Sequence, residues 1–232
     1  MPWKPVTANT GNASARPGQD GRFGRDPAAG NPGASGFSKP AGSGGSGGFA
    51  FTPLEANGTA IALTGSPPVP SATPRCIWDR VTNLIWEVKT NDGGLQDQNH
   101  TYGWGANNTG TCTGGSGCST DAYINDLNNV AGGVCPVTGA GVWRLPTVQE
   151  LLSIVNFGSS SPAIDVNYLP NTMSASYRSA ETGSLVLPPP PINPPPPPPP
   201  PLAVNGVVRF DSGVGLFVGF HNDHVRLVRD GP

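Results

Sequence analysis

Six residues near the C-terminus combine the side-chain types that bind small polar ligands. Between positions 209 and 223 the chain places aromatic rings beside polar groups, namely Arg209, Phe217, Phe220, His221, Asn222 and Asp223. Aromatic rings pack against the C–H faces of sugars, while amide, carboxylate and guanidinium groups bind hydroxyl groups. We therefore predict that this segment contacts a ligand, either a surface glycan or a protein.

Two further groups resemble metal ligands, but both patterns are weak. Asp92, Asp97 and Asn99 lie in a glycine-containing loop, but they are too few for Ca²⁺ and lack the EF-hand spacing. An Asx-rich turn explains them more simply, because Asn and Asp stabilise turns by local hydrogen bonds. His221 and His224 form an HxxH pair on an expected turn rather than on a helix. Ca²⁺ is therefore the only candidate cofactor.

The four cysteines indicate disulfides rather than catalysis or a zinc site. They form no CxxC pair, and an even count in a weakly charged chain is typical of exported proteins. The loop TGGSG can bring Cys112 and Cys118 to disulfide distance. Of the pairings that four cysteines allow, we predict Cys112–Cys118 and Cys76–Cys135. Because no GxSxG motif and no histidine-containing triad is present, we expect no enzyme.

Composition predicts one folded domain with low-complexity appendages. Of 232 residues, 33 are Gly and 28 are Pro. Residues 1–50 have Gly at nine of the eleven triplet positions between 18 and 48, which indicates either a disordered tract or a degenerate collagen-like one. We interpret 51–75 as a linker and 76–232 as the folded domain. A polyproline insert at 188–201 is either a spacer or a ligand for aromatic grooves.

Charge and hydropathy exclude several classes of partner. The net charge of -2 argues against nucleic acid, whose binding requires a basic face. No apolar run is long enough to span a membrane. The first residues lack the apolar region of a signal peptide, although the cysteines indicate export. We therefore expect either another export route or a start further upstream.

The elements that position these residues follow from local patterns. Strands are expected at Cys76–Asp79 and Leu84–Val88, on either side of a turn. Helices are expected at Thr120–Val130 and Thr147–Phe157, and the second begins with a capping box and carries an apolar stripe.

The C-terminal part of the chain reads as a three-stranded meander. Its strands are expected at Val204–Phe210, Leu216–Phe220 and His224–Arg229. In the last strand Arg226 and Arg229 alternate with apolar residues, so we expect at least one of them to face solvent.

Five segments in order along the chain resemble the Lcl C-terminal domain family, named for a bacterial collagen-like adhesin and long catalogued as a domain of unknown function. They are CIWDRVTNLIWEVKTNDGGLQDQNHTYGW, DAYINDLN, WRLPTVQELLSIVNFG, PAIDVNYLPNT and VRLVRDG, and they span about 76–232. The resemblance implies an α+β, C-type-lectin-like fold with two helices and twisted antiparallel sheets. One departure is the segment SASYRSAET, which lacks the Trp that members often carry there.

The resemblance also implies a function. It points to an exported bacterial surface module that acts as an adhesin or receptor-binding domain, in some members for glycans. Related proteins trimerise through collagen-like repeats, so a homotrimer is a further expectation. Two alternatives remain: a structural cap that trimerises a fibrous stalk, and a diversified C-type-lectin-like display protein.

Overall fold

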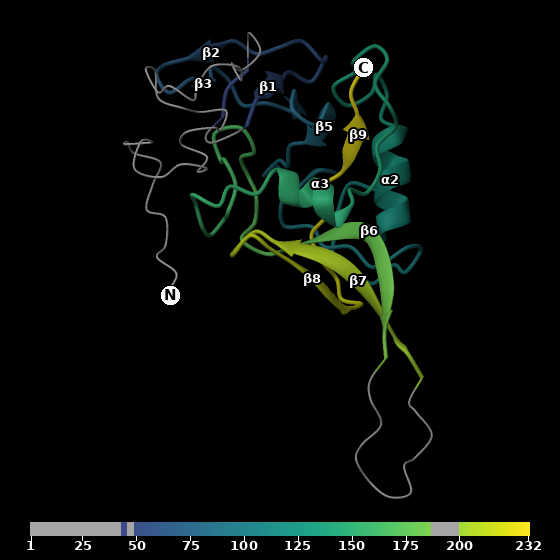
Figure 1. The fold of residues 1–232 in the computed structure, drawn as a ribbon. Coiled ribbons are helices and arrows are strands. Elements are labelled where there is room, and N and C mark those ends of the chain that lie inside the picture. The colour runs from purple at the N-terminus through teal and green to yellow at the C-terminus, as the bar shows by residue number, and fades with distance from the viewer. Residues whose placement is uncertain (1–42, 46–48, 187–199) are drawn as a thin grey trace, which may run out of the picture.

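The computed structural model describes residues 43–45, 49–186 and 200–232 (Figure 1). Its mixture of short helices and antiparallel sheets is an α+β fold, as predicted. The elements, in chain order, are β1 (Phe51–Leu54), β2 (Leu63–Thr64), β3 (Val69–Pro70), β4 (Cys76–Asp79), β5 (Leu84–Glu87), α2 (Thr120–Asn128), α3 (Val148–Ser153), β6 (Ser176–Leu185), β7 (Leu202–Arg209), β8 (Val214–Gly219) and β9 (Val228–Asp230).

The first sheet has the strand order β1-β4-β5-β9 and is antiparallel throughout. The predicted hairpin of β4 and β5 is confirmed, and its turn is held by Asp79, which accepts hydrogen bonds from Val81 N and Thr82 Oγ1. Ile77 and Trp86 are paired in register and face one hydrophobic cluster, whereas Ile85 faces another. Both faces of this sheet are therefore buried.

The interpretation of 51–75 as a linker is wrong for its first part. Residues Phe51–Leu54 form β1, which pairs with β4 and is buried at all four positions. Pro53 masks this strand in the sequence, because proline is expected only where a strand lies at the edge of a sheet. β1 occupies such an edge position in the order of the sheet. The folded unit therefore begins before Cys76.

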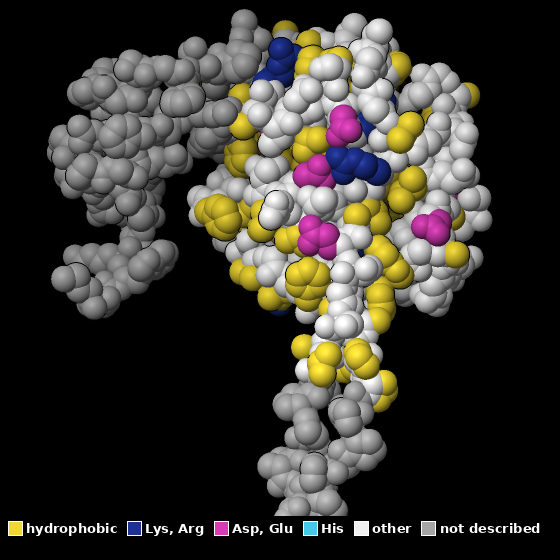
Figure 2. Space-filling model, turned by 45° about the vertical axis from the view of Figure 1, so that its right-hand side comes forward, with side chains coloured by type: hydrophobic (Ala, Val, Ile, Leu, Met, Phe, Trp, Pro, Cys, Tyr) yellow, Lys and Arg dark blue, Asp and Glu magenta, His cyan; other side chains and the backbone are white. Residues whose placement is uncertain are grey.

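The second sheet, β6-β7-β8, contains a strand that the sequence did not predict. β6 (Ser176–Leu185) is made largely of small and polar residues, which gave no alternating pattern, yet Tyr177, Arg178 and Ser179 are buried. β6 and β7 end opposite each other at Leu185 and Leu202. Their outer ends project from the body as a stem, along which apolar side chains are visible in Figure 2.

The predicted C-terminal meander is wrong in its third strand. β7 and β8 form a hairpin near the predicted positions, but β9 pairs with β5 in the first sheet. The chain after β8 therefore crosses from one sheet to the other. Arg144 N and Val228 N each donate to the carbonyl of the other residue, which ties β9 to the segment before α3.

Both predicted helices are present, and the second is shorter than predicted. Ser119 caps α2 by accepting a hydrogen bond from Ala122 N, and the capping box of Thr147 and Glu150 begins α3. α3 ends at Ser153 rather than at Phe157. After it Asn156 Oδ1 accepts a hydrogen bond from Gly158 N, and such an Asx turn competes with further helix.

Two disulfides brace the fold as predicted. Cys76–Cys135 joins β4 to the segment after α2, and Cys112–Cys118 closes a short loop before α2. The first bridge lies within the hydrophobic cluster that packs α2 against the first sheet, where Tyr123, Leu127 and Ile85 are buried. The second hydrophobic cluster packs α3 and the β6–β8 sheet against the opposite face of the first sheet.

The prediction that Arg226 or Arg229 faces solvent is wrong, because both are buried. Arg226 Nη1 donates to the Glu87 carbonyl at 2.5 Å and its Nη2 donates to Thr172 Oγ1 at 2.7 Å. Arg229 donates to the Cys135 carbonyl and packs over the Trp143 ring. Terminal nitrogens of both guanidinium groups thus donate to acceptors of the chain itself, whereas their Nε atoms have no hydrogen-bond partner among the described residues.

Two predictions concern segments largely outside the described residues. They are the collagen-like or disordered tract at 1–50 and the polyproline insert at 188–201. Within the described residues, none of the helices has the length and apolar character needed to cross a bilayer.

Candidate functional site

The six predicted ligand-binding residues do not gather in one place. Arg209 lies at the end of β7 and binds Asp211. From there β8 runs six residues, about 20 Å at ~3.4 Å per residue, to the segment that holds Phe220. Phe217 is paired with Gly206, so the side-chain positions of these two residues lie on the same face of the sheet. A Cβ atom at Gly206 would contact Val148 of α3. Phe217 therefore lies on the α3 face of the sheet, apart from Phe220.

Asn222 and Asp223 bind other parts of the chain, although Asn222 remains exposed. Asn222 Nδ2 donates to the Thr109 carbonyl at 2.6 Å, and Thr109 Oγ1 donates to Asn222 Oδ1 at 2.8 Å. Tyr102 N donates to the Asp223 carbonyl at 3.0 Å. These hydrogen bonds hold the segment after β8 against the loop at residues 103–118.

A buried ion pair lies directly beneath this contact. Arg178 of β6 donates through Nη2 to Asp223 Oδ2 at 2.5 Å and also to the His221 carbonyl. Arg178 is fully buried, and its Nε and Nη1 have no hydrogen-bond partner. Burial raises the pKa of Asp223, and the guanidinium opposes that shift. The pair therefore fixes the segment after β8 to the second sheet.

Beside this pair lies what we call the aromatic patch, defined as Trp104, Phe220 and His221, in which Trp104 is half-buried against the hydrophobic cluster that packs α2 and the other two residues are exposed. The ring centroids of Trp104 and Phe220 are 6.0 Å apart, and the Arg178 guanidinium lies 5.6 Å from the Trp104 ring. Phe220 is 43% exposed and His221 is exposed. This arrangement offers two aromatic surfaces and one imidazole to a ligand.

The loop that carries Trp104 is held at several points. Its N–H groups at Gly103 and Gly110 both donate to the Cys118 carbonyl, and the Cys112–Cys118 disulfide closes the loop. Thr120 N donates to the Gly103 carbonyl, which attaches the loop to the start of α2. Trp104 is therefore positioned before any ligand arrives.

The acidic loop, which carries Asp92, Asp97 and Asn99, forms a set of Asx turns. Asp97 accepts hydrogen bonds from Gly93 N and Asn99 N, and Asp92 accepts from Thr90 Oγ1 and Gly94 N. These bonds lower the pKa of both carboxyl groups. Their oxygens are used by the turn, so nothing in this loop supports Ca²⁺ binding.

The HxxH pair also fails to form a site. His221 is exposed, whereas His224 is partly buried and packs against Tyr177 at 5.5 Å between ring centroids. In the described part of the chain, no three His, Cys, Asp or Glu side chains are placed to hold a metal ion.

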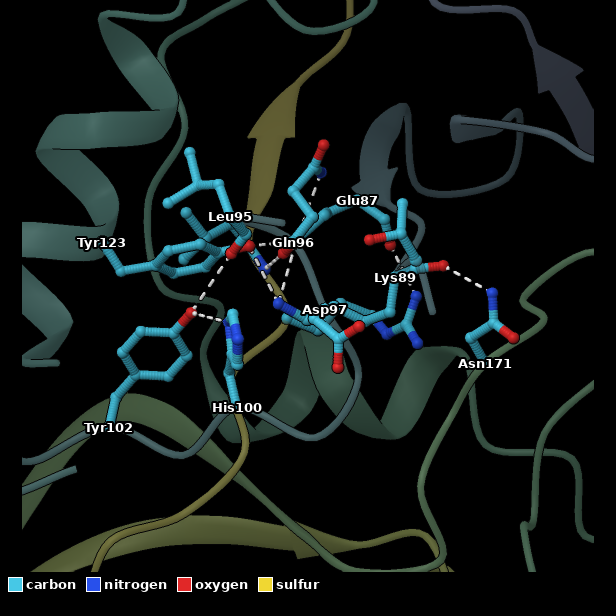
Figure 3. Close-up of polar contacts among 12 residues, drawn as sticks. Glu87, Lys89, Leu95, Gln96, Asp97, His100, Tyr102, Tyr123 and Asn171 are labelled. Atoms are coloured by element: carbon cyan, nitrogen blue, oxygen red, sulfur yellow. Dashed lines mark hydrogen bonds and ion pairs between the residues drawn. The ribbon is translucent and has the colours of Figure 1, made fainter. Parts of the chain in front are cut away.

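A buried polar network lies under the acidic loop (Figure 3). Its centre is Glu87, whose Oε1 binds Lys89 Nζ at 2.9 Å and the Tyr123 hydroxyl, and whose Oε2 accepts from Leu227 N. Burial lowers the pKa of Lys89, although the adjacent Glu87 opposes this shift. Gln96 also donates to Glu87 at 3.3 Å. The network ties the loop to β5 and α2, which is a structural role.

A shallow groove of about 450 Å³ lies between β1, the segment after it and the hairpin of β4 and β5. Its walls include Leu54, Ile61 and Trp78, and the Arg80 guanidinium lies 3.8 Å from the Trp78 ring centroid. That cation covers one aromatic face, and Trp78 Nε1 already donates to Asn83. The groove therefore offers a ligand fewer unoccupied aromatic and polar groups than the aromatic patch does.

Comparison with known proteins identifies the family. The Lcl C-terminal domain model matches residues 75–229, more than half of the chain, so this protein belongs to that family. Membership suggests a surface-associated domain. No curated protein and no solved structure matches.

Sequence reasoning missed Trp104 as a residue of the patch and Arg178 as a member of the ion pair beside it. Trp104 stands between Gly103 and Gly105 in a polar stretch, where a large aromatic side chain has little local reason to be buried. That isolation was a usable signal. Arg178 carried none, because its partner Asp223 lies 45 residues away.

Proposed function

We propose that this chain is an exported bacterial surface module that binds a glycan or protein ligand through the aromatic patch, and that it is not an enzyme. The observation that carries the proposal is the pair formed by the half-buried Trp104 and the exposed Phe220, held beside a fixed ion pair. Exposed aromatic pairs on a rigid support are the usual means of binding sugar rings and apolar side chains.

Several features support this function. The two disulfides are typical of exported proteins. All four cysteines are paired, so the chain has no thiol to act as a nucleophile. The bonds of Asn222 and Arg178 arrange the patch in advance, which reduces the entropy that a ligand must overcome on binding. The C-type-lectin-like architecture is part of this proposal.

A glycan array and a panel of peptides, probed with the full chain, test the proposal. Trp104→Ala and Phe220→Ala should each lower binding at least tenfold. Phe157→Ala is the matched control, because Phe157 is 77% exposed and lies after α3. Binding that all three variants retain would place the ligand elsewhere and overturn the assignment.

Addition of Ca²⁺ or a chelator separates a metal-dependent site from this one. We expect no change in binding, because the acidic loop uses its carboxylates in turns. Loss of binding in chelator would contradict the aromatic patch as the whole site.

A further inference from the structure

β8 is an edge strand without the usual protection against pairing. Edge strands of natural sheets normally carry charges, proline or a bulge that discourage another strand from adding. The sequence of β8 is VGLFVG, with no charged residue and no proline, and its register against β7 is continuous. Its unpaired side therefore remains a template for a further strand.

The outer side of β8 is open in the described part of the chain. Among the residues that the structure describes, the sheet order places β8 beside β7 alone, and no backbone hydrogen bond links β8 to a segment outside this hairpin. Val214, Leu216 and Phe217 are 46%, 39% and 56% exposed. An uncharged apolar strand with this exposure is expected either to find a partner strand or to promote aggregation.

We propose that β8 pairs with β8 of a second copy of this chain, antiparallel and centred on Leu216, to give a continuous six-stranded sheet. A two-fold axis perpendicular to the sheet places the same side chain of both copies on the same face of the joined sheet. Two residues can therefore lie opposite each other across the seam only if their positions differ by an even number. Centring on Leu216 satisfies this rule.

The side chains of β8 complement each other in this register. Leu216 lies opposite the second copy's Leu216, and Val214 lies opposite its Val218, so one face carries an apolar row across the seam. On the other face Phe217 lies opposite the second copy's Gly215, beside which the Val148 and Leu152 side chains of that copy's α3 offer the ring an apolar surface. No like charges meet, because the strand has none. These matches favour a second copy over a charged peptide.

Cysteine cross-linking in the full chain tests the pairing and its register. Directly opposed residues have Cα atoms about 4.5–5.5 Å apart, which a disulfide can bridge. Leu216→Cys should therefore form a disulfide-linked dimer under mild oxidation. Val214→Cys alone and Val218→Cys alone should not, because each lies about 13 Å from its own copy, whereas a mixture of the two should cross-link.

Val142→Cys is the matched control, because Val142 is 73% exposed and lies outside β8. Equal cross-linking of Val142→Cys and Leu216→Cys, or none by Leu216→Cys, overturns the proposal. Preferential cross-linking of Phe217→Cys overturns the register. Thermal melts of each variant show whether it is folded.

Sedimentation equilibrium gives an independent test without cysteine. A six-residue seam buries less than a standard interface, so the unmodified chain should associate reversibly toward twice its 23.7 kDa mass. If the chain trimerises through another segment, pairs of trimers are expected instead. Leu216→Lys should weaken this association at least tenfold, and Val142→Lys should not. Association unaffected by Leu216→Lys means that another surface is responsible.

Discussion

Asn222 and Thr109 exchange two hydrogen bonds across 113 positions of sequence, and together with the Tyr102–Asp223 backbone bond they link the loop of Trp104 to the segment of Phe220. Each half of the aromatic patch comes from one side of this link. The separation of Trp104 and Phe220 therefore depends on Asn222 rather than on a contact between the two rings alone.

Asn222→Ala should weaken ligand binding more than it weakens the fold. Its bonds are exposed, so we expect a loss of about 1 kcal/mol in the free energy of unfolding, together with a clear loss of affinity as the loops separate. Asn57→Ala is the control, since Asn57 also makes exposed turn bonds, far along the chain. Equal affinity of the two variants would show that the hydrogen bonds between Asn222 and Thr109 do not organise the patch.

Arg178→Ala should be among the most destabilising single changes. It leaves Asp223 buried without its cation, and breaking a buried pair by removing one partner costs about 3–5 kcal/mol. Replacing both partners by apolar residues, as in Arg178→Met with Asp223→Leu, should cost less than the single change. Urea denaturation of Arg178→Met, Asp223→Leu and the double variant, beside Arg178→Ala, measures this, and a double variant that loses the sum of the two single effects would argue against coupling.

The two disulfides should differ in their contributions to stability. Cys76–Cys135 closes a loop of 59 residues and Cys112–Cys118 one of 6. On the chain-entropy model these correspond to about 4 and about 2 kcal/mol. Paired Cys→Ser variants, compared by thermal denaturation, should show the larger loss for the longer loop. Equal losses would mean that loop closure in the unfolded chain does not set these contributions.

His224 should make the fold less stable as the pH falls through about 6.5. Burial lowers the pKa of His224 in the folded protein, and Lys89 contributes to the same shift. Between the folded and unfolded pKa values the unfolded chain binds the extra proton, so stability decreases with falling pH in that window. Carboxyl groups with lowered pKa values, such as Glu150, act only below about pH 4.5.

The measurement is the melting temperature between pH 7.5 and pH 5. His224→Gln should flatten this pH dependence, while His221→Gln, at an exposed position, should leave it unchanged. A flat profile in the unmodified protein would count against the assignment to His224.

A chain shortened to residues 76–232 should be poorly folded, whereas one that starts at Ser43 should not. Removal of β1 takes away Phe51 and Leu54, both buried. Burial of these two side chains contributes about 3–6 kcal/mol, and their loss also uncovers one edge of β4. Far-ultraviolet circular dichroism and urea melts of the two fragments measure the difference. Equal stability would show that β1 is dispensable.

Local signals predicted local structure well. The β4–β5 hairpin, the capping box of α3 and the short disulfide loop depend on residues close together in sequence, and each was predicted. The failures involve distant partners. β6 has no pattern of its own and becomes a strand because β7 pairs with it, and β9 pairs with β5, where Val228 joins the buried cluster on one face of the first sheet.

The site was predicted only in part for the same reason. Phe220 and His221 were identified from their residue types, and both belong to the aromatic patch. Asn222 and Asp223 were assigned to a ligand, but the fold uses their polar groups to join segments that lie more than 40 residues apart. A side chain's capacity for hydrogen bonding says nothing about whether its partner is a ligand or another part of the chain.

The pairing of Leu185 with Leu202 has a consequence for how this protein can change. The chain leaves and re-enters the folded unit at one point, at the end of a stem directed away from the body. The number of residues inserted between these two positions is therefore not fixed by the core. A change in length between these two positions should leave the pairing of β6 with β7 and the hydrophobic core unaltered.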